Sequence, residues 1–350
     1  MGNIENLINK VNETHNHLGE LTAICQISIK ARKLLMVVSP SGCGKSTAML
    51  LAANAYPDIL APDRISLAEL GQYVERLSGK EATILIDDMA TTGTEYARNM
   101  LMTVLTALVY THHVESAMAG SVYQITNFNG AALVGIQPVL LRELMMSPVW
   151  DASIQDKSLR YYYLYRPESP KDAPALKIHR GLSIDDVNKF EPDKTSIVWQ
   201  KLFQLGLMQW SKARTRQHLI DYLKAIAALE NRNDVIADDY VLLEHLLRPM
   251  ALEPMSVTKN QLEGERKLNN NLLALLTEYY SYGGKFLLAQ AASDYKLPLQ
   301  KCYEILKEQS EYWEQISKSP SIFKPSKILL ATLSKYRLEF DCAKQEKLQE

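Results

Sequence analysis

The chain has 350 residues, of which 47% are hydrophobic and 23% are charged, and its formal net charge is -1. This length exceeds one typical domain, and the composition suits a globular protein with sizeable cores. The near-neutral charge excludes a strongly basic nucleic-acid-binding protein, so any contact with DNA must come from a local patch. Four scattered cysteines, with no C-x-x-C spacing, favour a reducing, cytoplasmic location, and the sequence predicts no membrane segment and no secretion signal.

Residues 33–47, KLLMVVSPSGCGKST, predict a site for a nucleoside triphosphate. The apolar run to Val38 is typical of a buried parallel strand, and the loop after it follows the pattern G-x-x-x-x-G-K-[ST] except for Ser39 in first place. Lys45 is expected to reach the β- and γ-phosphates of ATP, and the Ser46 hydroxyl to bind Mg²⁺. The alternative is a glycine-containing turn that precedes a lysine by chance. The residues expected to bind the nucleotide are Ser39, Pro40, Ser41, Gly42, Cys43, Gly44, Lys45, Ser46 and Thr47.

A second motif strengthens this interpretation. Residues 82–88, ATILIDD, form another apolar strand pattern that ends in two carboxylates. Asp87 is expected to hold the water shell of Mg²⁺, and Asp88 to polarise the attacking water. The alternative for two aspartates after a strand is a helix N-cap.

Strand and helix patterns alternate through the first part of the chain, which predicts an α/β fold with a parallel sheet covered by helices. After a helical segment at 94–111, SVYQITN and AALVGIQ flank NFNG, so we expect a hairpin over residues 121–137 that turns at Asn129–Gly130. AALVGI also predicts a core strand, and Gln137 at its end is expected to orient water or contact the γ-phosphate. The alternative for Gln137 is an amide that caps the next helix.

The predicted organisation has three parts. Residues 1–170 form the nucleotide-binding core, 171–255 a helical lid, and 256–350 a C-terminal domain. In that last domain, three predicted helices at residues 268–280, 285–295 and 298–309, followed by a hairpin, form the outline of a winged helix that binds DNA. The alternative is a module that contacts proteins.

The order of these motifs resembles the AAA+ ATPases, in the branch that contains the MoxR group and the minichromosome-maintenance helicases. VGIQP resembles that branch's sensor-1 strand, which usually ends in Asn-Pro, so Gln137 replaces the Asn, and Asp88 stands where the family commonly has Glu. The predicted hairpin lies where the branch carries a pre-sensor-1 hairpin. SLRYYYLYRP resembles the arginine-finger segment, which implies that Arg160 reaches a neighbouring subunit's ATP. SKARTRQHLIDYLKAIAALENRNDVIADDY is similar to the lid, which implies that Arg214 is sensor 2, followed by Arg216.

A finger supplied by a neighbour implies that ATP binds between subunits of a homo-oligomeric ring or spiral. The preferred hypothesis is therefore an oligomeric ATPase that acts on DNA as a helicase, translocase or replication-type remodeller. A MoxR-like remodeller of a protein partner is the second hypothesis, because the C-terminal section is nearly neutral. The third is a slow ATP-gated scaffold or switch, because Asp88 is one methylene shorter than Glu.

Overall fold

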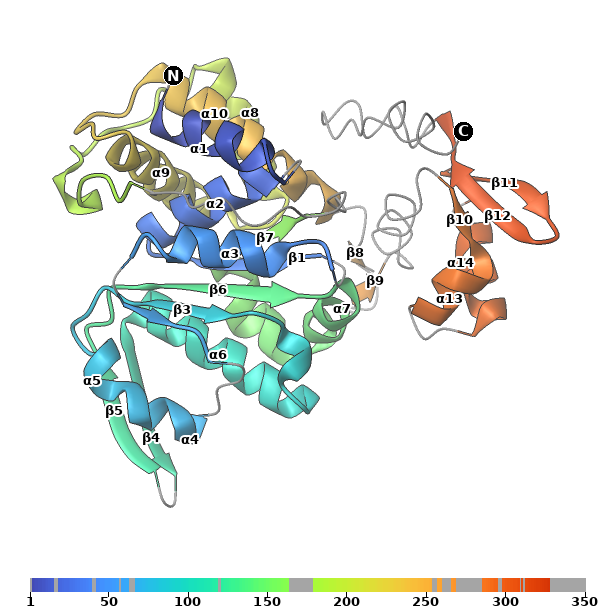
Figure 1. Ribbon diagram of the computed structural model, residues 1–350, viewed down its shortest axis with the longest axis horizontal. Helices are drawn as coiled ribbons and strands as arrows, with labels where there is room; N and C mark the ends of the chain where they lie inside the picture. The colour runs from blue at the N-terminus through green and yellow to red at the C-terminus, as the bar shows by residue number, and fades with distance from the viewer. Residues whose placement is uncertain are drawn as a thin grey trace. The chain divides into compact units, whose positions relative to one another are not determined.

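The computed structural model divides the chain into two compact units, one with Met1–Tyr163 and Pro167–Met250 and the other with Leu164–Arg166 and Ala251–Glu350. Each unit contains its own β-sheet (Figure 1). The structure describes residues 2–15, 18–39, 42–56, 58–62, 67–118, 121–163, 179–253, 257–259, 266–268, 285–294, 298–308, 310 and 312–327.

A five-stranded parallel sheet forms the centre of the first unit in the described residues, with the strand order β2-β3-β6-β1-β7. β1 and β6 are buried along their whole length, because helices cover both faces of the sheet. Val38 pairs with Ile136 and Tyr162, so these three strands end at one edge. The α/β fold is confirmed, and it is consistent with a P-loop-like core. The strands are β1 (Leu34–Val38), β2 (Ile59–Leu60), β3 (Thr83–Ile86), β6 (Ala131–Ile136) and β7 (Ser158–Tyr162).

Helices cover the two faces of the sheet, and α3, α6 and α7 each follow the carboxyl end of a strand. α2 and α3 cover one face, and α6 lies on the other, packed against α7 (Figure 1). Thr94 caps α6, because its side-chain oxygen accepts the N–H of Ala97, and Pro138 takes the first position of α7, where its missing N–H costs nothing. The loops before α3, α6 and α7 therefore meet at one edge. These helices are α2 (Leu18–Lys30), α3 (Lys45–Ala53), α6 (Glu95–Thr111) and α7 (Pro138–Met146), and the short α4 (Leu67–Leu70) and α5 (Val74–Leu77) precede β3.

A helical layer joins the N-terminal helix to the helices that follow the sheet in sequence. α1 packs against α2 and α9, and α8 packs against α9 and α10. Buried Ile4, Leu7 and Val11 recur at helical spacing on one face of α1. The helices of this layer are α1 (Asn3–Asn12), α8 (Ile197–Leu207), α9 (Lys212–Leu229) and α10 (Ala237–Leu247).

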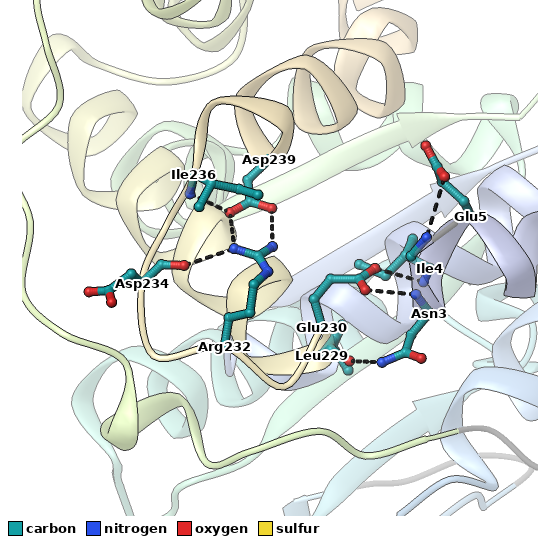
Figure 2. A network of polar contacts seen from close by, with 10 residues as sticks. Asn3, Ile4, Glu5, Leu229, Glu230, Arg232, Asp234, Ile236 and Asp239 are labelled. Carbon is teal, nitrogen blue, oxygen red and sulfur yellow. Dashed lines mark hydrogen bonds and ion pairs between the residues drawn. The ribbon is translucent and has the colours of Figure 1, made fainter.

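The turn between α9 and α10 holds the start of α1 (Figure 2). The two carboxylate oxygens of Glu230 accept the N–H groups of Asn3 at 2.7 Å and Ile4 at 2.9 Å. A carboxylate at this position also interacts favourably with the positive end of the helix dipole. In the same turn, Arg232 donates to both carboxylate oxygens of Asp239, which is 3% exposed. This turn therefore fixes the chain's first helix to its helical layer.

The hairpin of the first unit differs from the prediction. It consists of β4 (His113–Met118) and β5 (Ser121–Thr126), inserted between α6 and β6. The predicted turn at Asn129–Gly130 is wrong, because β6 is buried and pairs in parallel with β1 and β3, which leaves β4 as the partner of β5. Gly130 serves a close approach instead, since a Cβ there would lie 1.8 Å from the Ala82 carbonyl oxygen.

The second unit contains two short helices and a three-stranded antiparallel sheet, with the order β10-β12-β11 in its described part. The sequence predicted a helix from residue 285, but Phe286 begins a short strand and pairs with Phe323. Its ring lies 5.9 Å from Phe323 and 5.4 Å from Trp313, centroid to centroid, so aromatic packing holds it in the core. The predicted first helix, residues 268–280, lies almost entirely outside the described residues. The elements are β8 (Val257–Lys259), β9 (Arg266–Leu268), β10 (Phe286–Leu287), α13 (Leu288–Asp294), α14 (Leu299–Glu308), β11 (Trp313–Lys318) and β12 (Ser321–Pro325).

Candidate nucleotide site

The predicted phosphate loop leads from β1 into α3. Gly42 and Gly44 have φ angles of 77° and 80°, which is the left-handed region that glycine enters without steric cost. α3 begins at Lys45, directly after Gly44, so the unsatisfied N–H groups of its first turn lie next to the loop. Backbone of this kind binds phosphate, because the N–H groups and the helix dipole both favour an anion.

The remaining loop residues have different environments. Ser39 is buried, and its N–H donates to the carbonyl of Ile136 at 3.1 Å, which continues the pairing of β1 with β6. The Cys43 side chain is also buried, which excludes it from the loop's exposed surface. Pro40 and Ser41 lie outside the described residues. Ser39 thus extends the strand where the pattern has glycine.

Three of the predicted catalytic residues meet at the carboxyl edge of the sheet. The Lys45 Nζ lies 3.5 Å from Oδ2 of Asp88, and the Gln137 Nε2 donates to the same oxygen at 3.1 Å. Lys45 is 5% exposed, so its charge lies in a largely desolvated position. Oδ1 of Asp88 accepts the N–H of Ala90 at 2.9 Å, so Asp88 is also the N-cap of the short 3₁₀ helix Met89–Thr91, as the alternative interpretation expected. Gln137 makes no side-chain cap bond to α7, which argues against the capping alternative.

The predicted magnesium ligands lie at the same edge. Asp87 is exposed directly after β3, and Ser46 and Thr47 are half-buried in the first turn of α3. A hydroxyl and a carboxylate beside a phosphate loop fit Mg²⁺, which prefers oxygen ligands and usually shares them with substrate phosphates. The described part of the chain contains no group of three or more His, Cys, Asp or Glu side chains that could hold a metal by itself.

Gly135 of β6 is a site residue that the motif analysis missed. A Cβ at this position would lie 2.0 Å from the carbonyl oxygen of Asp87 and 3.0 Å from Cε of Lys45. Because residue 135 has no side chain, the Asp87 backbone, directly after β3, and the Lys45 side chain can both approach β6 closely. The signal was available, because a glycine inside a strand pattern often marks a close backbone approach.

The structure corrects the prediction for Arg160. Its side chain is 0% exposed, and its guanidinium donates to the carbonyls of Gln155, Ser158 at 2.7 Å and Gln209 at 3.0 Å. It also lies 5.2 Å from the centroid of the Trp150 ring. A finger has to reach another subunit, whereas this guanidinium is enclosed by its own chain. The amide of Gln209 completes the enclosure, because it pairs with both backbone groups of Arg160 along the edge of β7.

Arg214 is corrected for a different reason. Its guanidinium carbon lies 6.0 Å from the centroid of the Tyr110 ring, and the Lys33 Nζ lies 5.4 Å from that same centroid. Lys33 precedes β1, whereas Lys45 follows it, and a strand of five residues spans about 16 Å. Arg214 therefore lies at the edge of the sheet opposite the phosphate loop, where it does not act as a sensor of nucleotide bound to its own chain. Arg216 forms an ion pair with Glu191.

A polar cluster of Lys33, His218 and Asp221 lies near Arg214 at this opposite edge. The Lys33 Nζ lies 2.5 Å from a carboxylate oxygen of Asp221, and Nε2 of His218 makes a hydrogen bond of 3.0 Å with the Asp156 carbonyl. Burial lowers the pKa of His218 to about 4, and the nearby charge of Lys33 contributes. These contacts tie α9 to the segments that precede β1 and β7.

Comparison with other proteins gives no family to which this arrangement can be assigned. No model of a known protein family matches the chain, and no curated protein matches it either. Among the helices that the structure describes, none is long and apolar enough to cross a membrane.

Proposed function

We propose that the protein is a magnesium-dependent ATPase of the AAA+ type that acts on DNA. The observation that carries the proposal is the meeting of Lys45, Asp88 and Gln137, from three separate segments, beside a glycine loop at the start of a helix. This combination provides a cation for phosphate, a carboxylate for water and an amide that donates to the carboxylate. Magnesium held by Ser46 and Asp87 would neutralise charge on the phosphates.

Each group of the proposed site has a separate role in hydrolysis. The amides at the start of α3 and the charge of Lys45 bind and orient the triphosphate. Asp88 accepts a hydrogen bond from the attacking water and orients it toward the γ-phosphate. Because Arg160 and Arg214 lie elsewhere, Lys45 is the residue left to stabilise the charge that develops on the γ-phosphate, and magnesium held by Ser46 and Asp87 would supply further positive charge there.

Two features support DNA as the target. The hairpin of β4 and β5 precedes β6, at the position where the resembled branch has a pre-sensor-1 hairpin. In the second unit, the order strand, helix, helix and hairpin agrees with part of a winged helix, with α14 as the helix that enters a groove. α14 and the β11–β12 hairpin expose Lys301, Lys307, Lys318 and Lys324, of which Lys301 and Lys324 form ion pairs with glutamates.

ATP hydrolysis measured with and without single- and double-stranded DNA tests this proposal. We expect hydrolysis that Lys45→Ala abolishes, stimulation by DNA, and DNA binding that weakens with salt and with the double substitution Lys307→Ala and Lys318→Ala. Assembly into a ring or spiral is proposed from the resemblance to the AAA+ ATPases alone, since the enclosed Arg160 does not support it. Electron microscopy with a slowly hydrolysed ATP analogue tests this assembly. Turnover and oligomer size that are both indifferent to DNA would exclude a DNA motor, and a stable protein partner retained at low salt would favour a protein remodeller.

A slow ATP-gated switch is the second candidate, and the placement of the two arginines favours it. An arginine finger accelerates P-loop enzymes by factors on the order of 10³ to 10⁵. Arg160 cannot supply that factor from its enclosed position. Turnover slower than once per minute, unchanged when the protein assembles, would support the switch, whereas fast turnover that depends on assembly would exclude it.

A further inference from the structure

We infer that Arg98 of α6 is a positioning residue for ATP hydrolysis, because it joins the loop after Asp88 to α7. The inference rests on the proposed ATPase function and adds a residue to that site. Arg98 lies at the end of the first turn of α6, outside the phosphate loop and outside the motifs at the strand ends.

Arg98 makes two directed contacts with two different segments. Its Nη1 donates to the Thr92 carbonyl at 3.1 Å, and its Nη2 lies 2.8 Å from Oε2 of Glu143, on α7. The Arg98 side chain is 15% exposed, so the surrounding protein restricts it to this geometry. A planar guanidinium holds two acceptors in fixed directions at once. Arg98 therefore sets the distance between the loop after β3 and α7.

The Thr92 contact reaches Asp88 through one short turn. Residues 89–91 form a 3₁₀ helix, for which Asp88 is the N-cap and Thr92 the C-cap. At the start of this turn, Oδ1 of Asp88 accepts the N–H of Ala90, and at its end the Thr92 carbonyl is held by Arg98. Because the carboxylate is bonded to the turn, any rotation of the turn would also rotate the carboxylate.

The Glu143 contact reaches the same carboxylate from α7. The Gln137 carbonyl accepts the N–H of Leu141 at 3.0 Å in the first turn of α7, and the Gln137 side chain donates to Oδ2 of Asp88 at 3.1 Å. These bonds and the two contacts of Arg98 form a closed ring that passes through α6 and α7. Loss of Arg98 opens the ring, and catalytic groups displaced by about 1 Å lose rate on the order of 10²-fold.

Stability and rate should respond differently to the loss of this ion pair. Glu143 is 45% exposed, and an ion pair with one partner largely in water contributes little to the free energy of unfolding. The rate of hydrolysis instead depends on the position of the carboxylate that orients water. A lower kcat with little change in ATP affinity or stability is therefore the result that distinguishes a positioning role from a structural one.

The experiment measures kcat in single-turnover reactions, the affinity for ATP with a fluorescent analogue, and urea unfolding of the same samples. Arg98→Ala and Glu143→Ala are each expected to lower kcat by about tenfold, with the ATP affinity within about twofold of wild type. The double variant is expected to match Arg98→Ala within about twofold, because Glu143 acts only through Arg98.

Arg248→Ala is the matched control. Arg248, at the end of α10, is 12% exposed and forms an ion pair of 2.7 Å with Glu244, so its loss removes a similar contact from the helical layer. This control should leave kcat unchanged. Arg98→Lys keeps the charge but lacks the planar fork, and it should fold and lose about threefold in kcat.

Three results would overturn the inference while the ATPase proposal stands. The first is wild-type kcat in Arg98→Ala or, if that variant does not fold, in Arg98→Lys, which would leave Arg98 a structural role only. The second is an unchanged kcat with ATP binding weakened about tenfold, which would make Arg98 a nucleotide contact. The third is a double variant in which the two single effects multiply. A wild-type protein that binds ATP without hydrolysing it would instead overturn the ATPase proposal, and the inference with it.

Discussion

Substitution of Gly135 by alanine tests the geometry of the nucleotide site most sharply. The added Cβ would lie 2.0 Å from the Asp87 carbonyl oxygen, whereas ordinary contact begins at 3.4 Å, so the end of β3 has to move by about 1.4 Å. The shift would displace the two aspartates from Lys45. Misplacement of catalytic groups by about 1 Å costs on the order of 10²-fold in rate, and overpacking costs about 1–3 kcal/mol of stability.

The assay combines kcat/KM for ATP with urea unfolding of the same samples. We expect Gly135→Ala to fold, to lose about 1–3 kcal/mol and to lose about 10²-fold in kcat/KM. Gly93→Ala is the matched control, because Gly93 lies in the loop between β3 and α6 and a Cβ there would meet no atom within 4 Å. A Gly135→Ala variant with wild-type stability and activity would show that β6 does not approach Asp87 and Lys45 this closely.

Three further predictions concern the scaffold. Burial lowers the pKa of His218 to about 4. Between about pH 6.5 and 4 the unfolded chain therefore binds a proton that the folded chain does not. The free energy of unfolding should fall as the pH drops through this window, by up to about 3 kcal/mol. His218→Gln should flatten this dependence in unfolding measurements at several pH values, and His113→Gln should not. Arg160→Ala should cost about 3 kcal/mol or more, since it removes the guanidinium donor from buried carbonyls, of which that of Ser158 keeps the Trp210 Nε1–H. A stable variant that loses only stimulation by assembly would instead support Arg160 as an arginine finger. Glu230→Ala should cost about 1–2 kcal/mol in urea unfolding, because two N–H groups at the start of α1 lose their acceptor, and an unchanged midpoint would contradict that role.

Local signals were sufficient for the strands of the parallel sheet and for the glycine turn between β1 and α3. An apolar run followed by Gly42, Gly44 and Lys45 predicts a strand, a tight turn and the start of a helix. Glycine favours the turn, because it adopts positive φ angles without steric cost. The approach of Asp88 and Gln137 to Lys45 followed from the rule that parallel strands end at the same edge. The bond between Gln137 and Asp88 was not predicted, because it depends on distances between neighbouring strands.

The hairpin and the two arginines depended on partners that the sequence does not show. Asn129 and Gly130 form a favourable turn pair, but burial of β6 between two parallel strands outweighs this local preference. The enclosure of Arg160 requires the carbonyls of Gln155 and Gln209, and Gln209 lies 49 residues further along the chain.

By itself, the sequence determined the α/β core, the loop that suits phosphate and the carboxylates beside it, because these follow from periodicity and from the conformational freedom of glycine. Only the tertiary structure decided which cations reach that loop. A charged side chain can lie enclosed, as Arg160 does, or at the opposite edge of the sheet, as Arg214 does, and its position depends on long-range packing that short motifs do not encode.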